Sequence, residues 1–414
     1  MTYLETLGFN AVTAEKKLAS AGTDLKNRAL KNIADALRKS CDMIIAANGE
    51  DVKRGRENGM SESLIDRLSL TKARIESMAK GAEDVAAAAD PVGKVLWGEK
   101  RPNGLDIQKV SVPIGVIAVI FEARPNVTSD AAALCLKAGN AVILRGGKEA
   151  LSSNKAISDV MRGAIAEAGL PEDCIQFVTD TSHEGVNELM KMNEYIDLLI
   201  PRGGARLINA VVKGASVPVI QTGVGNCHVY VDKFADVDMA ANIVFNAKTS
   251  RPSVCNACES LIIHKDIAEK ALPLIKARLD EKNVEIRGDE AVCAVLKDAV
   301  PASDDDWGRE YLDYIISVKT VGDIDEAIAH IAKYGTGHSE AIVTDNYASA
   351  KKFTSEVDAA AVYVNASTRF TDGGEFGFGA EIGISTQKLH ARGPVGLDKL
   401  TSEKFIVLGS GQVR

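Results

Sequence analysis

The chain has 414 residues, which is too long for one compact core and fits two or three domains. Its residues are 46% hydrophobic and 26% charged and include only 11 prolines, a composition that excludes collagen-like, low-complexity and disordered classes. The formal net charge of −8, from 49 basic and 57 acidic residues, disfavours general nucleic-acid binding.

The sequence shows no signal for export or membrane insertion. Residues 1–10 lack the basic patch followed by an apolar run that a secretory signal needs. The most apolar stretch, residues 112–121, contains Pro113 and falls far short of the roughly 20 residues that a membrane-spanning helix needs. The seven cysteines are scattered and odd in number, unlike those of a secreted disulfide scaffold. We therefore expect a cytoplasmic protein with reduced cysteines and no membrane partner.

A helical region is predicted from residue 24 to about residue 90. Thr23 or Asp24 is expected to cap its first helix, because a short polar side chain can accept a hydrogen bond from the free N–H groups there. Apolar residues then recur every four positions, which places them on one helix face. These residues are Leu25, Ala29, Ile33 and Leu37.

Short apolar segments alternate with helices between residues 115 and 220. The helices are expected at residues 129–138 and 153–168, ending at Gly139 and Gly169. Continuous apolar runs are typical of strands buried on both sides, and their alternation with helices indicates a parallel, doubly wound α/β sheet. The five strands are expected at residues 115–121, 141–144, 175–178, 196–200 and 217–220.

The loops that follow these strands are rich in Gly, Arg and Lys. Ligands of such sheets bind where loops leave the carboxyl ends of the strands, and glycine and basic residues there suit a phosphate. The pattern favours a nucleotide site, although G-x-G-x-x-G is absent and each loop taken alone is explained by turn chemistry. The loops occupy residues 122–126, 145–148, 180–182, 201–204 and 221–226.

A second α/β alternation begins after about residue 226 and predicts a second domain. We place a dinucleotide-binding domain at residues 1–222 and a catalytic domain at residues 223–395. Residues 100–112 and 396–414 are expected to be arms for subunit pairing, with loose surface segments as the alternative. The strands of the second domain are expected near residues 229–231, 261–263, 314–318, 341–343 and 361–364, and a terminal strand at residues 404–408.

Cys255 is the candidate nucleophile. It lies between a polar loop that contains Arg251 and an apolar segment, and a neighbouring cation favours the thiolate, which suits acyl transfer. Cys255 and Cys258 also form a C-x-x-C. A zinc site would need a second ligand pair, which the sequence lacks, so we expect no metal and interpret Cys258 as a core residue.

The other cysteines and the histidines are interpreted as structural. Cys227 and His228 are adjacent, but neighbouring residues on a strand point to opposite faces, so this pair is not expected to form a dyad. G-x-S-x-G is absent, which argues against a serine hydrolase. The residues interpreted as packing or surface positions are Cys41, Cys135, Cys174, Cys293, His183, His264, His330, His338 and His390.

Five strings of the sequence are distinctive: VIFEARPN (119–126), ILRGGKE (143–149), QTGVGN (221–226), RPSVCNA (251–257) and FGFGAEIGIS (376–385). Together they resemble the γ-glutamyl phosphate reductases, a branch of the aldehyde dehydrogenase superfamily. The resemblance covers essentially the whole chain. It implies an aldehyde dehydrogenase-like fold, with a Rossmann-type doubly wound cofactor domain, a second α/β catalytic domain and small oligomerisation arms.

The resemblance also implies catalytic roles. Cys255 matches the family nucleophile. Asn126 matches the asparagine whose side-chain amide forms an oxyanion hole with the backbone N–H of Cys255. The implied activity is the reduction of L-glutamyl 5-phosphate to L-glutamate 5-semialdehyde, through a cysteine thioester, in proline biosynthesis.

The implied cofactor is NADPH. Arg145 falls where relatives have a lysine at the adenosine ribose, and Lys148 falls where NAD-preferring relatives carry a glutamate. Replacing that acid by a cation favours a 2′-phosphate. Gly203 and Gly204 are expected near the pyrophosphate, and Glu310 matches the acid that contacts the nicotinamide ribose.

The substrate carries several negative charges, so basic groups are expected to bind it. The candidates are Arg124, Arg202, Arg251 and Arg369, each of which equally suits a structural ion pair. Residues 383–386, including Gly383 and Ser385, match the region where related enzymes hold an α-carboxylate. The resemblance further implies a homo-oligomer, dimer or tetramer, and makes contact with glutamate 5-kinase plausible.

The sequence departs from the wider superfamily at the residue that activates water for thioester hydrolysis. Aldehyde oxidisers carry a water-activating glutamate in the segment matched by residues 221–226, which holds no acid here. Its loss agrees with reductive chemistry, because hydrolysis would waste the thioester. Two alternatives are an NAD-dependent oxidiser of a small aldehyde, disfavoured by Lys148 and the missing glutamate, and a catalytically silent scaffold that kept the fold.

Overall fold

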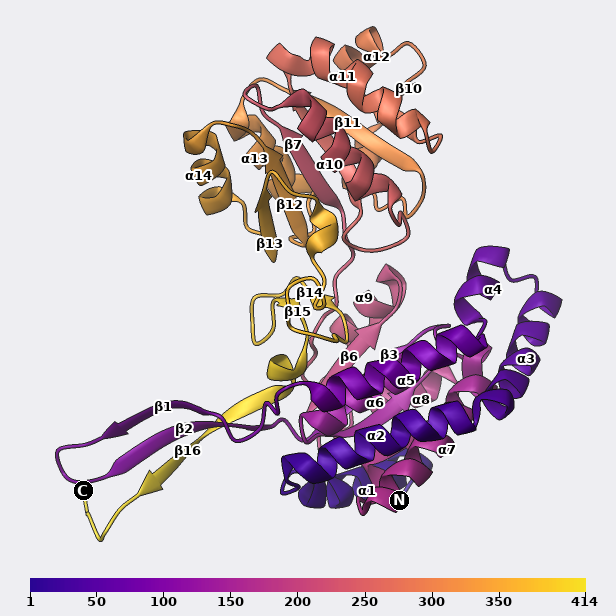
Figure 1. Cartoon of the computed structure of the whole chain (residues 1–414), viewed down its shortest axis with the longest axis vertical. Helices are drawn as coiled ribbons and strands as arrows, with labels where there is room; N and C mark the ends of the chain where they lie inside the picture. The colour runs from indigo at the N-terminus through magenta and orange to yellow at the C-terminus, as the bar shows by residue number, and fades with distance from the viewer. The chain divides into compact units, whose positions relative to one another are not determined.

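The computed structural model describes all 414 residues except the side chain of Ser63, and the chain divides into two compact units. Unit 1 comprises Met1–Thr222, Gly377–Gly383 and Val395–Arg414, and unit 2 comprises Gly223–Phe376 and Ile384–Pro394 (Figure 1). Residues 377–383, which the sequence places in the second domain, belong to unit 1. Each unit has its own parallel sheet.

The sheet of unit 1 has four parallel strands in the order β5-β4-β3-β6. The chain builds outward from β3 to β4 and β5 and then returns to place β6 on the other side of β3. The loops after β3 and β6 therefore flank the point where the strand order reverses, which is the usual ligand position of such sheets. The strands are β3 (Val116–Phe121), β4 (Ala141–Arg145), β5 (Ile175–Phe177) and β6 (Leu198–Arg202).

Helices cover both faces of this sheet. Apolar residues of α1 and α9 pack on the face that carries Val116, Ala118 and Ile120. Helices α6 and α7 cover the other face, with α2 and α5 packed against them. The helices are α1 (Tyr3–Leu18), α2 (Thr23–Lys39), α3 (Cys41–Glu57), α4 (Glu62–Leu68), α5 (Lys72–Ala87), α6 (Asn126–Lys137), α7 (Leu151–Ala168), α8 (His183–Leu189) and α9 (Ala205–Gly214).

Two local predictions for unit 1 are wrong. Residues 217–220 form only an isolated bridge between Leu199 and Val219, because Pro218 has no N–H to continue a ladder. The N-cap of α2 is Gly22, and the hydroxyl of Thr23 instead donates to Asp90 at 2.7 Å. The predicted glycine stops are confirmed, since Gly139 and Gly169 have φ of +79° and +99° directly after α6 and α7.

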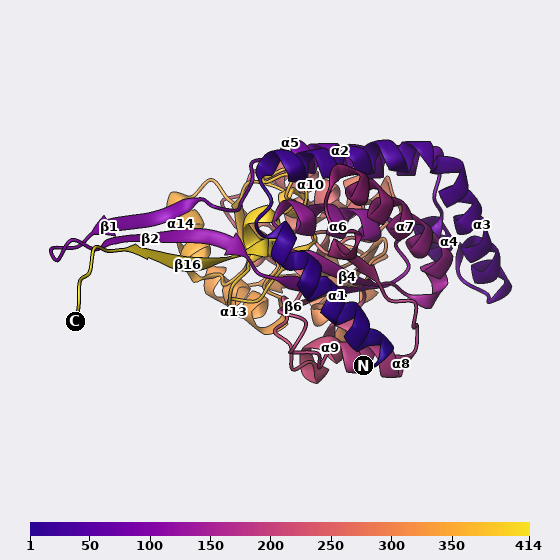
Figure 2. The same cartoon turned by 90° about the horizontal axis from the view of Figure 1, so that it is seen from below.

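An antiparallel sheet of three strands, in the order β1-β2-β16, extends away from the helices of unit 1 (Figures 1 and 2). Its strands are β1 (Val95–Lys100), β2 (Asp106–Pro113) and β16 (Thr401–Leu408). The side chain of Asn140 ties its base to the body, donating to the carbonyl of Leu400 and accepting from the N–H groups of Ile114 and Gly115. We call these three strands the arm.

Unit 2 has a parallel sheet of seven strands in the order β10-β9-β11-β8-β7-β12-β13. Its strands are β7 (Cys227–Val231), β8 (Cys258–His264), β9 (Glu285–Gly288), β10 (Val300–Pro301), β11 (Ile315–Val321), β12 (Ser339–Val343) and β13 (Ala361–Val364). A small hairpin, β14 (Ile384–Ser385) and β15 (Gly393–Pro394), completes the unit.

The two faces of this sheet bury separate cores. One face packs against α10, α11 and α12 through residues such as Val229 and Leu261, and the other packs against α13 and α14 through Tyr230 and Ile262 (Figure 1). Neighbouring residues of one strand thus serve opposite cores, as the strand period requires. The helices are α10 (Val237–Thr249), α11 (Lys265–Asp280), α12 (Glu290–Val295), α13 (Ile324–Tyr334) and α14 (Tyr347–Glu356).

Candidate active site

Cys255 lies in the turn between α10 and β8 of unit 2, and its thiol is half-buried. The backbone carbonyl of Cys255 accepts a hydrogen bond from the buried thiol of Cys227 at 3.2 Å. Gly225 packs directly against the same carbonyl, so that any side chain at Gly225 would overlap it. The backbone of the candidate nucleophile is therefore fixed from β7 and from the segment before it.

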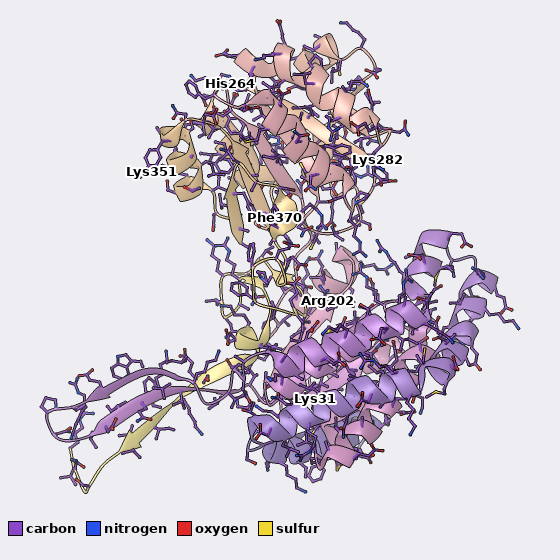
Figure 3. All side chains as sticks on the ribbon, in the orientation of Figure 1. Lys31, Arg202, His264, Lys282, Lys351 and Phe370 are labelled. Carbon is purple, nitrogen blue, oxygen red and sulfur yellow. The ribbon has the colours of Figure 1, made fainter. Side chains whose placement is uncertain are left out.

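Asn256, the residue after the candidate nucleophile, links this turn to the 3-10 turn η4 (Thr368–Phe370). Its side-chain amide donates to the carbonyls of Arg369 and Thr371 at 3.2 and 3.0 Å, and its own carbonyl accepts from the hydroxyl of Thr368 at 2.7 Å. Its side-chain oxygen also accepts from the guanidinium of Arg369. This network holds Arg369 beside the nucleophile turn, and Phe370 marks the same turn in Figure 3.

Positive charge gathers near Cys255. Arg369 is half-buried and donates to the hydroxyl of Ser250 at 3.0 Å. Burial lowers the pKa of Arg369, the charge of Arg251 lowers it further, and Cys255 acts in the opposite direction. Arg369 is thus close enough to interact electrostatically with both Arg251 and Cys255. A neighbouring cation generally favours the thiolate form of a cysteine.

The residues beneath the nucleophile turn form a buried, uncharged layer. Burial raises the pKa of Cys227 well above its usual range and lowers the pKa of His338 to about 4. The Nδ1 atom of His338 lies 2.7 Å from the hydroxyl of Ser339 and 3.7 Å from the sulfur of Cys227. A neutral thiol and a neutral imidazole here leave the half-buried Cys255 as the more accessible of the two sulfurs.

The structure also places several of the cysteines and one of the histidines interpreted from the sequence. Cys227 and His228 do not pair with each other, as expected, because His228 instead contacts Glu340 at 2.9 Å on the opposite side. Cys258 is buried, and burial raises its pKa to about 12, which confirms a core residue. Cys135 and Cys174 are fully buried, whereas Cys41 and Cys293 are only partly buried.

Glu310 lies close to the same turn. Its carboxylate accepts from the N–H of Gly225 at 2.8 Å through Oε1, and burial raises its pKa. The segment of residues 221–226 contains no acid of its own, but Glu310 reaches its backbone. Lys248 and Glu259 form a fully buried ion pair of 2.6 Å nearby, and Lys248 offsets part of the effect of burial on Glu310. Sequence reasoning missed this pair.

In unit 1, Asn126 is the first residue of α6 and is exposed. Its side-chain amide donates to Oδ2 of Asp130, one helical turn later, at 2.9 Å. Burial raises the pKa of Asp130 to about 6, and Asn126, Ser129 and Arg202 lower it. Asp130 was not identified from the sequence, although its four-residue spacing from Asn126 places the two on one helix face.

Arg145 and Lys148 lie at the carboxyl end of β4. The guanidinium of Arg145 donates to the carbonyls of Thr181 and Ser182 at 2.8 and 3.2 Å, and burial lowers its pKa. Lys148 is exposed at the start of the short helix that precedes α7. An exposed cation at this strand end fits a phosphorylated nucleoside, whereas Arg145 is largely engaged by the protein itself.

Gly203 and Gly204 precede α9, and Gly204 is its N-cap. The N–H of Gly204 donates to Glu122 at 2.9 Å, and a side chain at Gly203 would collide with the same carboxylate. A helix N-terminus behind two glycines fits an anion. A pyrophosphate bound there would take the place of the Glu122 carboxylate, a feature that the sequence did not indicate.

The remaining predicted substrate residues are divided between the units. Arg124 is exposed in the turn after β3 of unit 1, and Gly383 lies against Arg202 at the end of β6 (Figure 3). Ser385 is buried in β14 of unit 2, where its hydroxyl accepts from the N–H of Gln387 at 3.3 Å. Unit 2 thus brings Cys255, Arg251 and Arg369 together, and Arg124 and Gly383 lie in unit 1.

Comparison with known proteins covers the whole chain. A model of the aldehyde dehydrogenase family matches residues 9–299 and 290–405. The chain is 58% identical over 414 residues to a γ-glutamyl phosphate reductase of Lachnospira eligens, covering 100% of both, and 59% identical over 407 residues to one of Clostridium botulinum, covering 98% of both. The crystal structure of a γ-glutamyl phosphate reductase of Thermotoga maritima matches with a TM-score of 0.98 at 52% identity, covering 100% of both chains.

Among the helices of the described residues, none combines the length and the apolar character that crossing a bilayer requires.

Proposed function

The chain belongs to the aldehyde dehydrogenase family, and because its full-length relatives are γ-glutamyl phosphate reductases, we propose that it reduces L-glutamyl 5-phosphate to L-glutamate 5-semialdehyde and phosphate in proline biosynthesis. The observation that carries the proposal is the identity of 58% over all 414 residues. The geometry around Cys255 supports it, because a half-buried thiol beside two arginines suits attack on an anionic acyl donor.

In the proposed reaction, the Cys255 thiolate attacks the γ-acyl carbon of the substrate. The side-chain amide of Asn126 and the backbone N–H of Cys255 stabilise the negative oxygen of the tetrahedral intermediate. Collapse breaks the carbon–oxygen bond to phosphate, which leaves with the electron pair, and a thioester remains on Cys255. Losing an oxyanion donor typically lowers kcat by roughly 10²–10³.

The family uses a nicotinamide cofactor, and we propose NADPH for this chain. When bound, the cofactor supplies the hydride that converts the thioester carbon to the aldehyde oxidation level. Lys148 would hold the 2′-phosphate, the N–H groups before α9 the pyrophosphate, and Glu310 the nicotinamide ribose. One oxygen of Glu310 is used by the N–H of Gly225, so the other oxygen is the one proposed to accept a ribose hydroxyl. The Cys255 thiolate is regenerated when the aldehyde leaves.

The substrate is proposed to be bound by its charges. Arg251 and Arg369 lie beside the nucleophile turn and suit the carboxylate or phosphate groups. Arg124, Gly383 and Ser385 are retained as substrate-binding candidates. The proposal also includes a cytoplasmic location, a homo-oligomer paired through the arm, and contact with glutamate 5-kinase, because an acyl phosphate is labile in water.

A reverse assay tests the proposed reaction. With glutamate 5-semialdehyde and NADP⁺, NADPH formation should require inorganic phosphate, and Cys255→Ala should abolish it while the thermal unfolding midpoint stays unchanged. A phosphate-independent activity on simple aldehydes would support the NAD-dependent oxidiser instead. A Cys255→Ala variant that still supports growth without proline, in cells with no other copy, would support the silent scaffold.

A further inference from the structure

We propose that Asp130 is a positioning residue that fixes the orientation of the Asn126 side-chain amide. The inference rests on the proposed role of Asn126 as an oxyanion donor. The two side chains lie one turn apart on α6, and the amide nitrogen of Asn126 donates to Oδ2 of Asp130 at 2.9 Å. Both belong to unit 1.

An exposed asparagine needs such a partner to act as a donor. Its amide has a donating NH₂ end and an accepting oxygen end, and rotation about the last side-chain bond exchanges them. If the oxygen end faced the reacting carbonyl, it would repel the developing negative charge. A carboxylate only accepts hydrogen bonds, so Asp130 binds the NH₂ end and leaves its second N–H for the oxyanion.

Groups from α6, β6 and α5 surround the carboxylate of Asp130. The hydroxyl of Ser129 lies 3.4 Å from Oδ1 and donates to the carbonyl of Asn126 at 2.9 Å. Arg202 of β6 faces Asp130 with its positive charge, and α5 approaches with Gly81, where an added Cβ would lie 3.9 Å from Oδ1. These contacts restrain the carboxylate, and the Asn126–Asp130 hydrogen bond itself lies at the solvent-exposed end of the group.

Protonation of Asp130 is expected to remove its preference for the NH₂ end of the Asn126 amide. A protonated carboxyl carries an O–H donor and can bind either end of the amide. Burial raises the pKa of Asp130 to about 6, so this change falls within the range of an ordinary pH–rate profile. We expect kcat to fall below about pH 6 through loss of the carboxylate.

The first experiment measures the reverse reaction of Asp130→Asn and Asp130→Ala between pH 5 and 8. Asp130→Asn cannot ionise and has donors and acceptors, so its kcat should be several-fold lower at pH 8 and should lack the acid limb near pH 6. Asp130→Ala should lose about 10-fold or more in kcat, with the KM for NADP⁺ unchanged. An unaltered acid limb in Asp130→Asn would overturn the proposal.

A double-mutant cycle separates positioning from helix stability. Asn126→Ala should lower kcat, and Asn126→Ala/Asp130→Ala should lower it no further. The matched control is Asp159→Ala, which breaks an exposed pair of the same four-residue spacing with Lys155 on α7 and should leave kcat unchanged. Additive losses of kcat in the double variant, or full kcat in Asp130→Ala, would contradict the positioning role of Asp130 and leave the proposed role of Asn126 standing. Full kcat in Asn126→Ala would instead remove the proposed role of Asn126, and the inference with it.

Discussion

Lys148 is the residue that the proposed function uses to distinguish NADPH from NADH. It is exposed and lies at the carboxyl end of β4, where a 2′-phosphate would be held by charge. A hydrogen bond between charged groups contributes about 1.5–3 kcal/mol, so Lys148→Ala should lower kcat/KM for NADPH by about 10- to 100-fold and leave that for NADH nearly unchanged. Lys155→Ala, on the following helix, is the control. Equal losses with both cofactors would place the 2′-phosphate elsewhere.

Gly225 packs directly against the backbone of the turn that contains Cys255. An added Cβ would overlap the carbonyl of Cys255, and the N–H of Gly225 binds Glu310. Gly225→Ala should therefore displace the turn and lower kcat by 10-fold or more. Gly163, in the middle of α7 with open space around it, provides a matched change, and Gly163→Ala should stabilise the protein by about 0.5–1 kcal/mol without altering kcat. Normal kcat in Gly225→Ala would show that the turn tolerates the shift.

His338 should make the stability of unit 2 depend on pH. Burial lowers its pKa to about 4, whereas an exposed histidine in the unfolded chain titrates near 6.5. Between these values the unfolded state binds the extra proton, so the unfolding free energy should fall by up to about 3 kcal/mol as the pH drops from 6.5 to 4. Urea titrations followed by fluorescence in a Trp97→Phe background, in which Trp307 is the remaining tryptophan, should show a shallower fall in the unfolding free energy for His338→Asn. The same slope in both proteins would mean that His338 is protonated in the folded state.

At the scale of elements, the buried strands of both sheets were predictable because continuous apolar runs are typical of strands that are covered on both faces. The exceptions have local causes. Residues 217–220 look like a strand, but Pro218 cannot donate within a ladder, so only a single bridge forms. No residue of β1 is buried and the strand pairs on one side only, so its sequence carries no alternation of buried and exposed residues from which to predict it. Thr23 or Asp24 was expected to cap α2, but the N-cap is Gly22 and the hydroxyl of Thr23 donates to Asp90, which is far along the chain.

Lys248 of α10 and Glu259 of β8 form a buried ion pair, and removing only one of the two should destabilise the fold more than removing both. Lys248 and Glu259 are fully buried, and burial raises the pKa of Glu259 to about 7. Lys248→Met leaves a buried carboxyl without its partner and should cost about 3–5 kcal/mol, whereas Lys248→Met/Glu259→Leu should recover most of that loss. Urea denaturation measures both. Asp298→Ala, which breaks the more exposed pair with Lys276, should change stability by less than about 1 kcal/mol. A double variant as unstable as the single one would show that the pair has a further partner.

At the scale of the whole molecule, the sequence allowed candidate site residues to be named, but it did not indicate the contacts that hold them in place. Cys255, Lys148 and Asn126 sit in strings that the family resemblance identifies. Most of the contacts that hold these residues in place join positions that are far apart in the sequence. Asn256 binds the carbonyl of Arg369, 113 positions away, and no local pattern encodes that distance. Only Asp130, four residues from Asn126, had a spacing from which its contact could have been inferred.

One face of the arm carries exposed aromatic and apolar side chains together with an ion pair between Lys109 and Glu403. In its register, Trp97 and Phe405 both lie opposite Lys109, and Val407 lies opposite Ile107, so these side chains share one face of the sheet. Trp97 is 44% exposed and Phe405 62% exposed. Both outer strands, β1 and β16, also leave one edge without a partner strand in this chain, and natural proteins usually cover such edges.

If the arm pairs subunits, a charge on this face should separate them. Phe405→Glu would replace an exposed aromatic side chain by a second carboxylate beside Glu403, and sedimentation velocity should then show the wild-type oligomer converted to a smaller species. Lys404→Glu is the matched control, because the neighbouring residue lies on the opposite face of the same strand. It should leave the sedimentation coefficient unchanged. A wild-type monomer, or an oligomer that persists in Phe405→Glu, would mean that this face of the arm does not form the subunit interface.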